Sequence, residues 1–154
     1  MDMAGIEFFI PMANVPTVTQ QEHEIKVVRG RAIVYDPPRL REARLKFTAL
    51  LNQQATRFQR AEGGEPLLPL AGPVRLVTKW IWPCRTSGEE HLNGEWKTTR
   101  PDTDNLIKLF KDCMTKAGWW YDDAQVCSEI TEKFYGAKPG IYVRVERITQ
   151  NDEY

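Results

Sequence analysis

Four aspartates in two tight clusters are the residues of this chain best suited to chemistry. Asp102 and Asp104 form an Asp-x-Asp pair, and Asp122 and Asp123 follow as neighbours about one helix length later. Carboxylates held close together repel one another unless a cation neutralises them. Mg²⁺ prefers such oxygen ligands and keeps several waters, which suits it to phosphate substrates. If the clusters converge, they predict a magnesium site.

Each cluster also has an ordinary structural explanation. An aspartate at a loop-to-helix junction often caps the helix by accepting hydrogen bonds from its free amides, and aspartates are common in turns. The length of chain between the two clusters also limits whether their carboxylates can meet. A helix from Asn105 to Ala117 is about 20 Å long, whereas the three residues Trp119–Tyr121 span only about 10 Å. Within one chain the clusters meet only if the helix is tilted or shorter than its pattern indicates.

Lys108 is a further candidate because it lies four residues after Asp104, on the same face of the predicted helix. A lysine there can reach a phosphate oxygen or stabilise charge that develops in a transition state. The alternative is a surface ion pair worth about a few tenths of a kcal/mol. Phosphoaspartate hydrolases and nucleotide-sugar transferases place Asp-x-Asp after a hydrophobic strand, whereas polar residues 97–101 precede it here.

The elements around these residues predict an α+β fold, with a mixed β-sheet packed against two main helices. Helices are expected where apolar residues recur at three- and four-residue steps, from Pro37-Pro38 to about Gln59 and from near Asp102 to Ala117, before Gly118. Strands are expected at 6–10, 74–82, 126–134 and 141–148, and a hairpin at 25–35 that turns at Gly30. Loops are expected at 12–24, 61–73 and 84–99. The chain is expected to form one domain over residues 1–154, with 149–154 a frayed tail.

Composition bounds the class of protein. Apolar residues make up 42% and charged residues 27% of the chain, as in ordinary soluble domains. The apolar runs are too short to span a membrane, and the N-terminus lacks a secretory signal, so we expect a cytoplasmic protein with no membrane partner. The three cysteines include no Cys-x-x-Cys pair, which predicts reduced thiols. His91 is expected at the surface, and most of the five tryptophans in the core.

The charges are unevenly distributed although they sum to zero. Residues 26–60 carry nine basic and two acidic side chains, a net charge of +7, so the remainder carries −7. A basic segment beside an acidic cluster suits a metal-dependent enzyme that acts on a polyanion. The plainer alternative is a solvated helix face.

The joint pattern of the two aspartate clusters resembles the RusA family of Holliday junction resolvases. The resemblance rests on Arg-Pro-Asp-x-Asp-Asn-Leu-x-Lys (Arg100–Lys108), on Asp112 in the helix that follows, and on Gly-x-x-x-Asp-Asp-Ala-Gln-Val (Gly118–Val126). It implies a homodimeric α+β nuclease, of phage or prophage type, that acts in DNA recombination and repair. Such an enzyme requires Mg²⁺ or Mn²⁺, uses no small-molecule cofactor and nicks two opposed strands of a four-way DNA junction.

By this resemblance, Asp102, Asp104 and Asp123 are the essential metal-site carboxylates, Asp122 contributes, and Lys108 is the catalytic lysine. Water activated by the metal would attack a phosphodiester in line. Paired cuts on a two-fold junction call for a symmetric dimer with one site per subunit. The basic side chains expected to bind DNA phosphates are Arg29, Arg31, Arg39, Arg41, Lys79, Lys97 and Arg100.

Two alternatives of other classes stay open at this point. One is a non-catalytic branched-DNA-binding protein of phage recombination, against which the retention of every matched carboxylate and of Lys108 argues. The other is a protein-interaction module whose aspartates only cap a helix. That module would show neither a Mg²⁺-dependent change in stability nor salt-dependent binding to DNA.

Overall fold

A four-stranded mixed sheet forms the centre of the computed structural model, which describes residues 5–15, 24–35, 37–59 and 66–150. The strand order is β1-β8-β4-β7. Strands β4 and β7 are parallel, whereas β8 runs antiparallel to both β4 and β1. Parallel neighbours need a long crossover, and residues 84–125 supply it. The strands of this sheet are β1 (Ile6–Pro11), β4 (Val74–Pro83), β7 (Val126–Gly136) and β8 (Gly140–Arg147).

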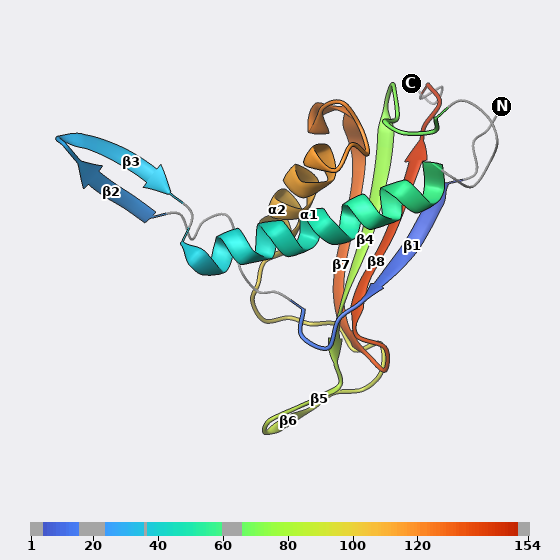
Figure 1. The fold of residues 1–154 in the computed structure, drawn as a ribbon. Helices are drawn as coiled ribbons and strands as arrows, with labels where there is room; N and C mark the ends of the chain where they lie inside the picture. The colour runs from blue at the N-terminus through green and yellow to red at the C-terminus, as the bar shows by residue number, and fades with distance from the viewer. Residues whose placement is uncertain (1–4, 16–23, 36, 60–65, 151–154) are drawn as a thin grey trace.

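Two helices, α1 (Pro38–Gln59) and α2 (Thr103–Lys116), pack on one face of this sheet (Figure 1). On β4 the alternate residues from Val74 to Trp82 are buried against them, and the residues between are only half-buried. Three aromatic rings join the layers, since Phe47 of α1, Phe110 of α2 and Trp80 of β4 meet pairwise edge-on, with centroids 5.3–6.1 Å apart. This packing fixes both helices relative to the sheet.

The hairpin of β2 (Glu24–Val28) and β3 (Arg31–Tyr35) extends away from this body (Figure 1). Arg29 and Gly30 form its turn with φ of 51° and 76°, the positive values that a tight two-residue hairpin turn requires. Ile25 and Val27 lie on one face of the hairpin and are 70% and 76% exposed. The described part of the chain therefore leaves an apolar hairpin face in solvent.

The predicted fold class is confirmed: the structure is α+β, with a mixed sheet and two main helices. The predicted hairpin, helices and strands occur within a residue or two of their expected positions. The residues expected to be loops at 16–23 and 61–65, and the end of the expected tail at 151–154, lie outside the described residues. Cys84, Cys113 and Cys127 are free thiols. Within the described residues, no helix is long and apolar enough to cross a membrane.

Residues 84–99 differ from the prediction of a plain loop. They contain a short hairpin of β5 (Arg85–Thr86) and β6 (Glu89–Glu90), and Trp96 then forms an antiparallel bridge with Phe134 at the edge of β7. Two-residue strands are too short to show a period in the sequence. Four tryptophans are buried as expected, whereas Trp96 is 62% exposed.

The packing of α1 predicts a large difference between two identical substitutions on that helix. Leu51→Ala, at a fully buried position, is expected to lower the free energy of unfolding by about 2–5 kcal/mol, because it leaves a cavity. Leu45→Ala, at a position 72% exposed, is expected to change it by less than about 0.5 kcal/mol. Urea unfolding of both variants checks this, and equal effects would contradict the packing described.

Candidate active site

The first aspartate cluster lies at the start of α2. Asp102 is the N-cap residue in an extended conformation (φ −72°, ψ 150°), and its side chain makes no capping hydrogen bond. Asp104 lies in the first helical turn, and both side chains are exposed. The helix-capping explanation for Asp102 is therefore wrong for its side chain. Both carboxylates are therefore exposed at the positive end of the helix dipole, and that of Asp102 makes no capping hydrogen bond.

The loop that leads into Asp102 is fastened to the sheet by Lys133 of β7. Its ammonium Nζ donates hydrogen bonds to the carbonyl oxygens of Thr99 (2.6 Å) and Pro101 (2.8 Å). Lys97 donates from Nζ to Thr99 Oγ1 at 2.7 Å. Burial lowers the pKa of Lys133, the neighbouring charge of Lys97 lowers it further, and Asp102 opposes both effects. The position of Asp102 thus depends on a contact with a distant strand.

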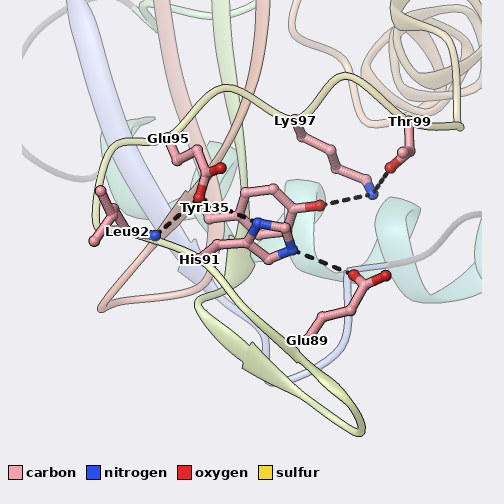
Figure 2. A network of polar contacts seen from close by, with 7 residues as sticks. All are labelled: Glu89, His91, Leu92, Glu95, Lys97, Thr99 and Tyr135. Carbon is pink, nitrogen blue, oxygen red and sulfur yellow. Dashed lines mark hydrogen bonds and ion pairs between the residues drawn. The ribbon is translucent and has the colours of Figure 1, made fainter.

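A second network of polar contacts holds an earlier part of the same loop, residues 89–95, against Tyr135 of β7 (Figure 2). The ring of His91 stacks on that of Tyr135, with centroids 3.6 Å apart and planes 6° from parallel. Its Nδ1 lies 3.1 Å from Glu95 Oε2, and its Nε2 lies 3.2 Å from Glu89 Oε2. The prediction that His91 is a plain surface residue was therefore wrong, because both nitrogens and the ring face are in use.

The backbone of residues 94–97 continues this bracing along the edge of β7. Gly94 N donates to Tyr135 O at 2.7 Å, Tyr135 N to Glu95 O at 2.8 Å, and Lys97 N to Lys133 O at 3.1 Å. These bonds cover part of an edge strand that would otherwise expose unpaired groups. They also bring Lys97 beside Lys133, under the start of α2.

The second aspartate cluster lies at the other end of the crossover, in the short helix η2 (Asp123–Gln125). Asp122 is its N-cap: its Oδ1 accepts a hydrogen bond from Ala124 N at 2.9 Å, and Asp122 N donates to Gln125 Oε1 at 3.0 Å. This reciprocal arrangement is a capping box. The structural explanation therefore holds for Asp122, and Asp123 remains as the carboxylate with no capping role.

The electrostatic surroundings of Asp123 place it beside the second half of α2. Partial burial raises its pKa, a hydrogen bond with Asp122 adds to the effect, and the charges of Asp112 and Asp122 raise it further. Lys111 opposes these effects, and its Nζ also pairs with Glu129 at 2.9 Å. Asp102 and Asp104 are not among the groups that shift the pKa of Asp123.

The two clusters consequently lie apart within one chain. Helix α2 and strand β7 run in opposite directions (Figure 1), so the start of one lies near the end of the other. Asp104 and Asp112 are eight residues apart, a rise of roughly 12 Å. Among the described residues, no three His, Cys, Asp or Glu side chains are grouped to hold a metal ion. Asp102 and Asp104 lie at the start of α2, whereas Asp122 and Asp123 lie beyond its end, near Asp112.

The predicted cationic residues fall into different surroundings. Lys108 is exposed on α2, one turn after Asp104, and Arg100 is exposed just before Asp102. Lys79 lies over the ring of Tyr142 at 5.6 Å on the uncovered face of the sheet, and Lys97 belongs to the loop network. Exposed arginines also line the turn of the hairpin and the first turn of α1: Arg29, Arg31, Arg39 and Arg41.

Sequence reasoning missed Lys133 as part of this site. It lies 34 and 32 residues from Thr99 and Pro101, whose carbonyl oxygens it binds, within a segment that the sequence predicted only to be a strand. The sequence carried no signal for it, because the register that pairs Lys133 with the buried Trp80, and so places it on the core-facing side of β7, is seen only in the structure. A lysine in such a position needs acceptors for its ammonium group.

Comparison with known proteins relates this chain to one family of nucleases. The family model described as "Endodeoxyribonuclease RusA" matches residues 14–146. A protein of Lactococcus phage r1t named "Crossover junction endodeoxyribonuclease rusA" is 28% identical over 142 residues, which cover 92% of this chain and 98% of that protein. Both aspartate clusters and Lys108 lie within the residues that match the family model.

The raised pKa of Asp123 predicts that its ionisation destabilises the fold. The folded chain binds this proton more tightly than the unfolded chain, so the free energy of unfolding falls as pH rises from 3.8 through the raised pKa. In metal-free buffer, Asp123→Asn is expected to increase the free energy of unfolding at pH 7, and the gain should vanish below pH 3.8.

Urea unfolding in EDTA at the two pH values measures this difference. Glu42→Gln, on the exposed side of α1, is the control and should have little effect at either pH. If Asp123→Asn is neutral or destabilising at pH 7, the described environment of Asp123 is wrong.

Proposed function

The chain belongs to the RusA family of endodeoxyribonucleases, and from this premise we propose that it is a crossover junction endodeoxyribonuclease, a Holliday junction resolvase. The observation that supports this most directly is the pair of exposed carboxylates, Asp102 and Asp104, held at the start of α2 without a capping role. Its substrate would be a four-way DNA junction, in which it cuts two opposed strands.

A divalent cation fits the carboxylates that the chain presents. Asp102 and Asp104 offer only oxygen donors, at exposed positions, which matches the ligand preference of Mg²⁺ and of Mn²⁺ as a substitute. A bound Mg²⁺ supplies Lewis-acid activation of water and neutralises phosphate charge. We assign Asp102, Asp104 and Asp123 as the residues that hold it, with Asp122 beside them.

Groups of the chain itself would bind the phosphate and stabilise the charge that develops on it. Lys108 projects from α2 one turn beyond Asp104 and would place an ammonium group against a phosphate oxygen as charge builds there. The start of α2 adds partial positive charge from its free amides, which favours a phosphate at the same end. Both contributions act at the end of α2 that carries Asp102.

A homodimer would complete the site. Because roughly 12 Å of helix separates Asp104 from the level of Asp112 and Asp123, one chain does not place all the carboxylates around one ion. We propose that Asp102 and Asp104 of one subunit face the partner's Asp123, and the reverse at the second site. A two-fold axis then produces two equal sites, as symmetric cuts in two strands require.

The β2–β3 hairpin supports a dimer through a separate observation. Ile25, Val27 and Ala32 share one face by the strand register, and all three are exposed. An isolated two-stranded hairpin is only marginally stable in water. We therefore assign the second subunit as the surface that covers this face.

DNA binding would use the exposed arginines of the hairpin turn and of the first turn of α1, together with Arg100. Contacts to phosphates make such binding weaken steeply as salt increases. Lys79 and Lys97 already interact with Tyr142 and with Thr99. Their contribution to DNA binding would require them to share or exchange those contacts.

The non-catalytic alternative has one observation in its favour, which is that a single chain brings no three metal ligands together among the described residues. It predicts a chain that binds four-way junctions in the presence of Mg²⁺ and cuts none of them. The cleavage experiment below separates the two functions.

Asp104→Asn is expected to lower the rate of Mg²⁺-dependent nicking of a labelled four-way junction by about 100-fold or more, because it weakens the metal site. Junction binding in EDTA should stay within about threefold of wild type, since no phosphate-binding cation is lost. Glu42→Gln serves as the charge-matched control and should cut normally. Wild-type cutting by Asp104→Asn, or binding without cutting by the wild-type chain, would contradict the proposed function.

A further inference from the structure

Lys133 is placed to control where the Asp-x-Asp pair points. It lies late in β7 with its side chain on the same face as Trp80, between the sheet and the start of α2. Its Nζ bonds to two carbonyl oxygens, of Thr99 and Pro101, that lie on either side of Arg100. Pro101 directly precedes Asp102, so a shift at these carbonyls moves the first carboxylate.

A lysine at this position has two effects that an apolar residue would not have: it donates hydrogen bonds to the loop, and it carries a positive charge near Asp102. Its ammonium group donates to two carbonyl oxygens of the loop that leads into α2, and leaving the partly buried acceptor at Pro101 unpaired would cost stability. It also places a positive charge close enough to Asp102 that the charge of this carboxylate raises the pKa of Lys133. That positive charge offsets the repulsion between Asp102 and Asp104 before a cation arrives.

Hydrogen-bond acceptors in the loop keep Lys133 in place although another lysine lies close to it. Lys97 repels it, yet Lys97 is fixed beside it by Thr99 Oγ1 at 2.7 Å and by the rings of Trp82 and Tyr135 at 5.2 and 5.4 Å. Two ammonium groups under one helix start are stable only where acceptors and carboxylates compensate them. Here those compensating groups belong to the Asp102 loop.

We propose that Lys133 is a positioning residue for the reaction: it braces residues 99–101 against β7 and thereby sets the affinity of the Asp102–Asp104 pair for a divalent cation. The cation half of this inference rests on the proposed function. The brace itself is a property of the chain alone, so the two can fail separately.

Three substitutions separate the parts of this role. Lys133→Met removes both the donors and the charge at similar length. Lys133→Gln keeps N–H donors on a shorter, neutral side chain, and Lys133→Arg keeps both donors and charge. Lys138→Met, in the exposed connection between β7 and β8, is the matched control because it removes a lysine that has no part in the site.

The first measurement is amide hydrogen exchange of residues 99–106 in metal-free buffer. Lys133→Met should speed exchange there by about tenfold, through easier local opening of the loop. Lys133→Arg should restore protection, and Lys138→Met should leave it unchanged. This readout does not depend on any activity.

The second measurement is cation affinity, by Mn²⁺ binding followed by electron paramagnetic resonance and by the Mg²⁺ dependence of single-turnover nicking. Lys133→Met should weaken both by about tenfold, as loss of groups that orient metal ligands does. Excess Mg²⁺ should recover the rate, and junction affinity in EDTA should not change. General loss of structure would instead lower the maximal rate.

Wild-type exchange and wild-type Mn²⁺ affinity in Lys133→Met would overturn the proposal. If that variant does not fold, Lys133→Gln decides: wild-type behaviour overturns the proposal, whereas weaker Mn²⁺ binding that Lys133→Arg restores supports it. A wild-type chain that binds no Mn²⁺ and cuts no junction refutes the proposed function, and exchange of residues 99–106 then decides on the brace by itself.

Discussion

The length and rigidity of α2 constrain the rest of this molecule. Six of its residues are buried against α1 and the sheet, so it can neither bend nor tilt freely to bring its two ends together. Asp102 and Asp104 stand at its start, and the crossover returns at its far end with Asp122 and Asp123. In the proposed cation site, which uses both pairs, a second chain would supply one of them, so the proposed active site depends on the proposed dimer.

Polar contacts hold the segments at both ends of this helix. At the start, Lys133 and the network of His91, Glu95 and Tyr135 hold a loop that hydrophobic packing alone would not fix. At the far end, a capping box fixes Asp122 and leaves Asp123 in surroundings that raise its pKa. An ionised carboxylate whose pKa the fold raises costs stability, and in the proposed function a bound cation would offset that cost.

Local periodicity made most of the fold predictable. The stripe from Leu106 to Ala117 and the alternation from Val74 to Trp82 depend on neighbouring residues only, and both predictions were confirmed. The brace at Lys133 and the stacking of His91 on Tyr135 depend on contacts between distant residues, which no local pattern encodes. The two-residue strands of 84–99 are local, but they are too short to show a period. The capping argument was right for Asp122 and wrong for the side chain of Asp102, which occupies the N-cap position but makes no capping hydrogen bond.

Subunit complementation tests the shared site most directly. Asp104→Asn and Asp123→Asn chains are each expected to be inactive on a four-way junction, and co-expressed chains would pair at random. If each site takes Asp104 from one subunit and Asp123 from the other, mixed dimers carry one intact site, and the mixture should regain about a quarter of the wild-type nicking sites. If each site lies within one chain, every site in the mixture carries a substitution. A mixture that exchanges subunits and still cuts nothing would contradict the account.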